Sequence, residues 1–346
     1  MTRRLPFAPV LVATVLLLLG CLLLGTLVGE EPLPPDAVAR AILHSILRSV
    51  PAIDRLVPPV EETVAAIVEL RLPRVLLAAL VGAALSVAGT ALQGLLGNPL
   101  ADPYTIGVSS GAAVGAGVAT LLGLTGLWGG VGQSALAFAG AVLAMLLVFA
   151  LARVGGRVHT AGFLLAGIVC GSFLWAIVTL LLALAREDQR TILLFLMGRL
   201  SEGGWPQVAA MAPVTGVATI AFLRGARGLD AFAFGEEIAL SVGVETERFK
   251  GYVLGVSALL TAVTVSVSGI IGFVGLIVPH LARFLVGPPH RGVLPLSALL
   301  GGSLLILADL LARTIRPGEE LPVGVITALL GAPAFLVLLR RQIGND

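Results

Sequence analysis

Long uninterrupted apolar runs limit this chain to one class of fold. Of its 346 residues, 57% are hydrophobic and only 12% are charged, and the mean hydropathy is +1.03. Soluble globular domains carry about 25% charged residues. Because no soluble core can bury so much apolar surface, the folded chain must be surrounded by lipid. The sequence therefore predicts an all-α polytopic membrane protein, with residues 1–346 forming a single transmembrane domain.

The number of membrane spans follows from the lengths of these runs. A helix needs about 20 residues to cross the ~30 Å hydrocarbon core of a bilayer. Nine runs meet this requirement, at about 7–28, 74–97, 104–124, 131–152, 161–184, 206–223, 251–271, 293–312 and 322–339. A tenth run, 272–287, is apolar but would reach only ~24 Å, and Pro279 and His280 are expected to break it in the middle. We predict ten transmembrane helices, because ten give every short loop a consistent side.

Lysine and arginine favour cytoplasmic loops, which sets the orientation. With ten spans, one side holds Arg3, Arg4, Arg153, Arg157, Arg224, Arg227, Arg248, Lys250, Arg283, Arg291, Arg340 and Arg341. Both termini are therefore predicted to be cytoplasmic, and the segment 224–250 lies on the same side. Residues 29–73 would form an extracytoplasmic loop. Within it, 36–50 has the apolar spacing of a short amphipathic helix, with a disordered loop as the alternative.

The stretch NPLADP, residues 98–103, interrupts the apolar sequence and has two interpretations. It is either an ion site inside the membrane or a turn at its edge. Asn-Pro and Asp-Pro are natural helix stops and starts, because proline disfavours helical angles in the preceding residue. Asn98 can cap the end of one helix, and Asp102 can begin the next. The turn is therefore favoured, at the cytoplasmic ends of the second and third spans.

Few residues inside the spans are suited to chemistry. Asp309 and Arg313 form an i, i+4 pair on one helix face, which favours a structural ion pair over a proton relay. A secondary transporter needs ionisable or unwound coordination near the midplane, and little is evident here. The four histidines lack metal-ligand spacing, and no glycine cluster is followed by the GK[ST] of a nucleotide-binding loop. The net charge of +2 is too small to indicate nucleic-acid binding.

Charged residues and an amphipathic segment instead lie at the predicted membrane edges. Arg71, Arg74, Arg313 and Arg316 lie at outer span ends, where arginine either pairs with carboxylates of a partner or anchors lipid headgroups. On the inner side, residues 229–250 carry an apolar strip of Ile238, Leu240 and Val244. That segment either docks into the groove of a partner or is a solvated loop.

Several long motifs resemble a known family. They are RLPRVLLAALVGAALSVAGTALQGLLGNPLADPYTIGVSSGA, FLMGRLSEGGW, FGEEIALSVGV, SGIIGFVGLIVPHLARFLVGPPHRGVLPLSALLGG, LADLLART and ELPVGVITALLGAPAFLVLLRR, spread from residue 71 to the C-terminus. The chain resembles the permease subunit of type II ABC importers for iron-siderophores, haem and cobalamin. Residues 1–70 match this family only in layout.

The resemblance implies ten spans related by an inverted repeat, and a homodimer whose translocation path runs between the two copies. It also implies two ATPase subunits on the cytoplasmic side, a substrate-binding protein outside, and a location in the bacterial inner membrane. The chain would be a transport subunit, not an enzyme; it would bind no cofactor itself, with ATP and Mg held by the ATPase. An ion-coupled secondary transporter is the alternative. The motifs do not distinguish iron-siderophore, the expected cargo, from haem or cobalamin.

The resemblance also assigns roles to individual residues. The residues expected to dock the binding protein, by pairing with its glutamates, are Arg71, Arg74 and Arg313. The residues expected to contact the ATPase are Gly235, Glu236, Ala239, Leu240 and Gly243. The family's cytoplasmic gate corresponds to GRVHT, which ends at His159 and Thr160.

Overall fold

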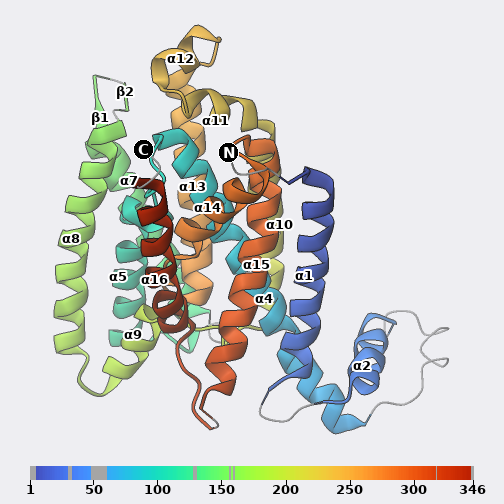
Figure 1. Ribbon diagram of the computed structural model, residues 1–346. Helices are drawn as coiled ribbons and strands as arrows, with labels where there is room; N and C mark the ends of the chain where they lie inside the picture. Colours follow the sequence, from blue (N-terminus) through green and yellow to red (C-terminus); the bar gives the residue numbers. More distant parts are fainter. Residues whose placement is uncertain are drawn as a thin grey trace.

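The computed structural model describes residues 5–29, 33–47, 61–127, 131–155, 157–158, 160–316 and 318–343, and these residues are almost entirely helical (Figure 1). The first half contains α1 Phe7–Leu27, α2 Pro35–Leu47, α4 Glu62–Leu96, η1 Pro103–Ile106, α5 Val108–Leu121, α7 Gly132–Ala152, β1 Arg153–Val154, β2 Arg157–Val158 and α8 Thr160–Leu184. The second half contains η2 Arg186–Asp188, α9 Gln189–Leu196, α10 Trp205–Arg224, α11 Ala226–Phe232, α12 Glu236–Ser241, α13 Thr246–Ser268, α14 Val274–Val286, α15 His290–Thr314 and α16 Val323–Ile343.

The all-α membrane fold predicted from the sequence is confirmed. Seven described helices are long and apolar enough to cross a membrane, and α5, α14 and α16 contribute three shorter apolar helices, ten in all. The start of α1 and the end of α16 lie at the same end of the bundle (Figure 1). We call this end the termini face; it also carries α11, α12 and the β1–β2 hairpin. The opposite face carries α2 and the loop between α15 and α16.

Helix α4 is the central element of the bundle and packs against α10, α13, α14 and α15. Two glycines on α4 allow the close approach that this requires. A Cβ added at Gly82 would collide with the backbone of Gly301 on α15, and one added at Gly89 would collide with the backbone of Gly275 on α14. In lipid, where helix association depends on close van der Waals contact, such small residues let backbones approach each other.

The beginning of α4 differs from the sequence prediction. The second span is expected near residue 74, after a loop over 29–73, but the helix begins at Glu62 and is 35 residues long. At 1.5 Å per residue it extends about 52 Å, well beyond the ~30 Å apolar layer. Its first turns are stabilised because Val64 and Val68 bury against Ala37, Val38 and Ala41 of α2. A short amphipathic helix thus lies against a helical extension of the second span.

The stretch NPLADP forms a hydrogen-bonded turn between α4 and α5. Gly97 ends α4 in the left-handed conformation, with φ of 57°, so the glycine, not Asn98, is the cap. The Asn98 side chain instead accepts a hydrogen bond from the Leu100 N–H at 2.9 Å. Asp102 begins η1 as expected, accepting from the Tyr104 N–H at 2.9 Å. These contacts match the turn interpretation.

Non-helical backbone between α13 and α14 is hydrogen bonded within the protein. The Arg199 N–H donates to the Ser268 carbonyl at 2.8 Å, and the Ile270 N–H donates to the Phe195 carbonyl at 3.2 Å. The Ile271 N–H donates to the Tyr104 hydroxyl oxygen at 3.1 Å. Irregular backbone at membrane depth is tolerated only where protein satisfies its polar groups in this way.

Pro279 does not break α14, contrary to the sequence prediction. A proline inside a helix leaves the carbonyl four residues earlier without its N–H donor. Here that carbonyl belongs to Gly275, and it accepts a hydrogen bond from Gln93 Nε2 at 3.3 Å. The same Nε2 also lies 3.2 Å from the Leu276 carbonyl. A side chain from α4 thus replaces the missing backbone donor, and the helix continues to Val286.

Candidate functional site

A buried ion cluster joins α4 and α15 at the opposite face. Asp309 is 1% exposed, and its Oδ1 accepts hydrogen bonds from Arg74 Nε at 3.1 Å and Arg74 Nη2 at 2.9 Å. Its Oδ2 lies 3.1 Å from Arg313 Nε. Arg313 Nη2 also donates to the Gly25 carbonyl at 3.0 Å. One carboxylate thus holds two arginines, which is the arrangement of a structural ion cluster and not of a proton relay.

Glu320 covers this cluster from the loop before α16. Its Oε1 accepts a hydrogen bond from Arg74 Nη1 at 2.6 Å. The Glu320 side chain is 45% exposed, whereas that of Arg74 is 12% exposed. The two arginines and two carboxylates balance in charge, and Glu320 is the member that an approaching molecule would meet first.

Two cavities open beside the cluster. One, of about 540 Å³, is lined by Gly29, Ile67, Leu70, Arg71, Arg74, Ser201, Gly203, Arg313, Gly318 and Glu320. The other, of about 380 Å³, shares Arg74 and Glu320 and adds Arg190 and Arg199. The opposite face is therefore hollowed and rich in arginine around the cluster, which suits contact with anionic groups.

The three arginines expected to dock a binding protein occupy one region and line the same cavity. Arg71 is half-buried beside Gly29, where an added Cβ would lie 2.6 Å from the Arg71 guanidinium carbon. Arg74 and Arg313 are buried against Asp309. The sequence predicts the Asp309–Arg313 pair from helical spacing but misses the partner Arg74, which is 235 residues from Asp309 along the chain.

At the termini face, α11 and α12 form a compact projection anchored to α13 (Figure 1). Phe232 stacks on Phe249 with ring centroids 5.5 Å apart, and Lys250 Nζ lies 2.8 Å from Glu236 Oε1. Gly235 and Gly243, which flank α12, both have positive φ, at 111° and 86°. These glycines allow the sharp turns that hold the short helix outward.

The projection exposes apolar side chains. Phe234 is 75% exposed, and Leu240 is 63% exposed, with Ile238 and Val242 also exposed. Ala239 is fully buried on the inner side of α12. Val244, which the sequence places in the same strip, instead packs against the core. An apolar patch of this kind on a short external helix is typical of a protein-docking surface.

The predicted gate is only partly described. His159 lies outside the described residues. Thr160 is the first residue of α8, directly after the β1–β2 hairpin in which Arg153 pairs with Val158.

Polar contacts near the termini face were missed by sequence reasoning. The Gln93 side chain bridges to Arg283, whose Nη1 donates to Gln93 Oε1 at 2.5 Å. Asp230 on α11 accepts from the His290 N–H at 2.8 Å and lies 2.6 Å from His290 Nδ1. A glutamine in the last turn of an apolar span was an available signal, because buried amides need partners.

Comparison with known proteins places the chain among transport proteins. The sequence pattern described as the FecCD transport family matches residues 16–341. An uncharacterised ABC transporter permease protein, YvrB of Bacillus subtilis, is 44% identical, over 93% of this chain and 90% of its own length. The cobalamin import system permease protein BtuC of Halobacterium salinarum is 40% identical, over 94% of each chain.

A solved structure supports the same relationship at the level of the fold. It is an inward-facing conformation of a metal-chelate type ABC transporter, with a TM-score of 0.80 and 28% sequence identity. The alignment covers 97% of this chain and 99% of the other. Similarity therefore extends over nearly the whole length of both molecules.

Proposed function

This chain belongs to the FecCD transport family, and we propose that it is the permease subunit of an ATP-driven importer for an iron-siderophore, with haem and cobalamin as the alternative cargoes. The observation that carries the proposal is the full-length similarity to ABC transporter permeases, in sequence and in fold. The protein would lie in the bacterial inner membrane, with its termini face toward the cytoplasm. The scarcity of ionisable groups in the spans disfavours an ion-coupled transporter.

The exposed patch on α12 is the proposed contact with the ATPase. Gly235 and Gly243 shape the helix ends, Glu236 ties the helix to Lys250, and Ala239 packs it onto the bundle. This leaves Leu240, with Phe234 beside it, directed outward. ATP and Mg would be bound by the ATPase subunits, and their closure would push this projection.

The arginine-rich opposite face is the proposed contact with a substrate-binding protein. We propose that Arg71, which lines the larger cavity, pairs with a glutamate on the partner. Arg74 and Arg313 are already paired with Asp309, so we propose that a docking carboxylate reaches Arg74 by displacing Glu320. The buried Asp309 keeps both arginines in place throughout.

Transport then follows from shifts between conformations of a homodimer, with the path between the two copies. ATP binding by the ATPase pair favours one orientation of the permease, and hydrolysis restores the other. A loaded binding protein promotes turnover only if it has different affinities for the two orientations. His159 and Thr160 are proposed to form the cytoplasmic gate.

Uptake into proteoliposomes tests the proposal. The permease, its ATPase and its binding protein are reconstituted, and ferric siderophore, haem and cobalamin are offered separately, with and without internal ATP. We expect ATP-dependent accumulation of one ligand. Accumulation driven by an ion gradient without ATP would contradict the importer and favour a secondary transporter.

A variant on α12 tests the coupling surface separately. Because Leu240 is exposed, Leu240→Glu should leave the fold intact but weaken ATPase binding at least about tenfold, since a charge would be buried in an apolar contact. The control is Glu237→Ala on the same helix. Equal ATPase affinity for both variants would remove α12 from the interface.

A further inference from the structure

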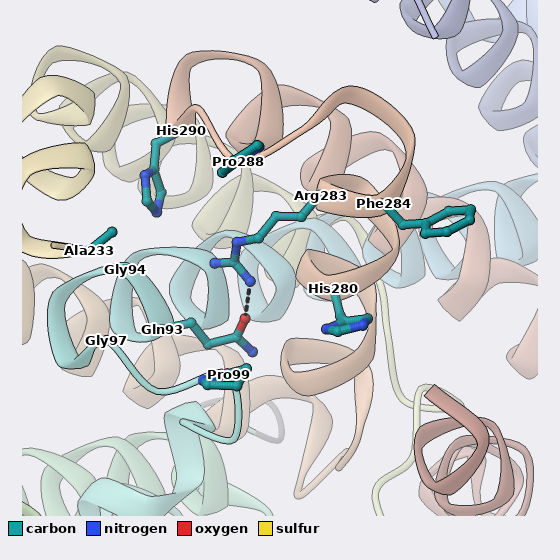
Figure 2. Close-up of a pocket in the computed structure, with 10 residues that line it drawn as sticks. All are labelled: Gln93, Gly94, Gly97, Pro99, Ala233, His280, Arg283, Phe284, Pro288 and His290. Atoms are coloured by element: carbon teal, nitrogen blue, oxygen red, sulfur yellow. Dashed lines mark hydrogen bonds between the residues drawn. The ribbon is translucent and has the colours of Figure 1, made fainter. Parts of the chain in front are cut away.

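A cavity of about 440 Å³ lies near the termini face, between the end of α4, α14 and the start of α15 (Figure 2). Its volume lies in the range of about 300–1,000 Å³ that is typical of small-molecule sites. Ten described residues line it: Gln93, Gly94, Gly97, Pro99, Ala233, His280, Arg283, Phe284, Pro288 and His290. Its polar lining thus consists of one arginine, two histidines and one amide.

The charge of Arg283 is not balanced by a carboxylate among the described residues. Its Nη1 donates to the neutral Gln93 Oε1 at 2.5 Å, and none of the lining residues is acidic. Figure 2 shows the guanidinium extending between His280 on one side and His290 on the other. Half-buried cations near a membrane normally pair with an anion, because an unpaired charge is costly there.

Gln93 fixes the guanidinium in this position. Its Nε2 is held by the Gly275 and Leu276 carbonyls, so its Oε1 can face only Arg283. That contact uses one Nη of Arg283 and leaves the other side of the planar group toward the cavity. A guanidinium held in one orientation suits bidentate binding of a phosphate oxygen pair.

His290 borders the same cavity but is closed off from it at Nε2. It is 2% exposed, and Asp230 fixes its Nδ1 at 2.6 Å. Its Nε2 is buried without a hydrogen-bond partner and faces Gly94, where an added Cβ would collide with it. Because Nδ1–H faces the Asp230 carboxylate, Nε2 of a neutral ring is an acceptor and offers no donor to an anionic oxygen, so the cation that the cavity presents is Arg283.

We propose that this cavity binds a phosphate group, anchored by Arg283 and bordered by His280 and His290. The ligand is either the headgroup of an acidic phospholipid or a free phosphate. Both offer the anionic oxygens that a fixed guanidinium recognises, and basic pockets between transmembrane helices near the cytoplasmic surface bind acidic headgroups. Because Ala233 of the cavity wall directly follows α11, a bound phosphate would touch the base of the α11–α12 projection.

The test measures binding by the full chain, without its transport partners. The first arm measures retention of phosphatidylglycerol by native mass spectrometry, after release of the protein from phosphatidylcholine nanodiscs containing phosphatidylglycerol. The second arm titrates inorganic phosphate into the delipidated protein in detergent and follows the phosphorus resonance. Arg283→Gln removes the anchor, and the matched control is Arg291→Gln, an exposed arginine outside the cavity lining.

A second variant keeps the test decisive if Arg283→Gln does not fold. Ala233 is exposed at the cavity wall, so Ala233→Glu places a competing carboxylate near Arg283 without removing any contact. Its control is Ala233→Gln. We expect Arg283→Gln and Ala233→Glu to weaken binding at least about tenfold and the two controls to leave it unchanged.

The two arms distinguish the source of the phosphate. Loss confined to phosphatidylglycerol retention identifies a lipid headgroup, and loss confined to inorganic phosphate binding identifies a soluble ligand. If neither ligand binds, or if binding is equal in the variants and their controls, the proposal is wrong. Failure of ATP-driven uptake in the proteoliposome experiment would not affect this result, because the binding assay contains no ATPase.

Discussion

At the opposite face, Arg74 and Arg313 share the buried carboxylate of Asp309, whereas near the termini face the partner of Arg283 among the described residues is the neutral amide of Gln93. The first region is internally balanced in charge, and its outermost member is the half-exposed Glu320. The second region has a cavity where a counter-ion would lie. In our two proposals, the first region exchanges one carboxylate for another on docking, whereas the second is completed by a ligand.

Removing the shared carboxylate should have the largest effect. Asp309→Asn leaves two arginines without their buried counter-ion, and breaking such a pair costs about 3–5 kcal/mol. We expect a large fall in the unfolding temperature of the permease in detergent. Asp188→Asn, at an exposed position, is the control. Equal unfolding temperatures for the two variants would mean that the cluster contributes little.

Removing the amide should have a smaller effect on stability. Gln93→Leu deprives the Gly275 carbonyl of the donor that Pro279 cannot supply, and an unsatisfied buried acceptor costs about 1–3 kcal/mol. Thermal unfolding in detergent measures this loss. Gln189→Leu is the control, because the Gln189 side chain makes an exposed contact. Unfolding at the wild-type temperature would show that α14 does not depend on Gln93.

Neutralising the outermost carboxylate should affect docking more than stability. Glu320→Gln weakens the ion pair between Glu320 and Arg74, in which the glutamate is about half exposed. An ion pair of this kind contributes about 0.2–1 kcal/mol to stability. If Glu320 competes with a docking carboxylate, the binding protein should bind up to about fivefold more tightly. Surface plasmon resonance measures this change, with Glu319→Gln as the control. Weaker docking would mean that Glu320 itself contacts the partner.

Reversing Arg71 alone separates docking from stability. Arg71→Glu should weaken docking while the fold persists, because the Asp309 cluster keeps both of its arginines. Reversing Arg74 or Arg313 would place acidic groups against Asp309, so any loss of docking would be confounded with unfolding. Unchanged docking of Arg71→Glu would remove this residue from the proposed interface.

The smallest effect on transport is expected in the NPLADP turn. Asp102→Asn still accepts the Tyr104 N–H, so uptake should persist. Burial raises the pKa of the Asp102 carboxyl from 3.8 to about 6, opposed by the Tyr104 hydrogen bond. A raised pKa means that this group stabilises the fold when protonated, and that this contribution is lost as the pH rises through about 6.

The asparagine variant should lack that pH dependence. Unfolding temperatures of the wild type and of Asp102→Asn, compared at pH 5 and pH 7, check this expectation. Abolished uptake with normal folding would instead favour an ion site at this turn.

Sequence reasoning recovered the parts of the molecule that depend on local periodicity. Apolar runs predicted nine spans, a consistent side for each short loop added the tenth, and the i, i+4 spacing predicted the pair of Asp309 and Arg313. It misjudged Pro279, because the donor that rescues the helix comes from Gln93 on another span. It also missed the early start of α4, because that extension depends on burial against α2.

The sequence by itself determined that lipid surrounds the protein, how many helices span the membrane, and that the α12 projection carries apolar residues. These properties follow from composition and from the fixed rise of a helix, which need no long-range information. Only the tertiary structure decided which polar and charged groups pair between different helices. Asp309 meets Arg74 and Gln93 meets Arg283 across separations of 235 and 190 residues, and such contacts depend on how helices pack, which periodicity along one helix does not contain.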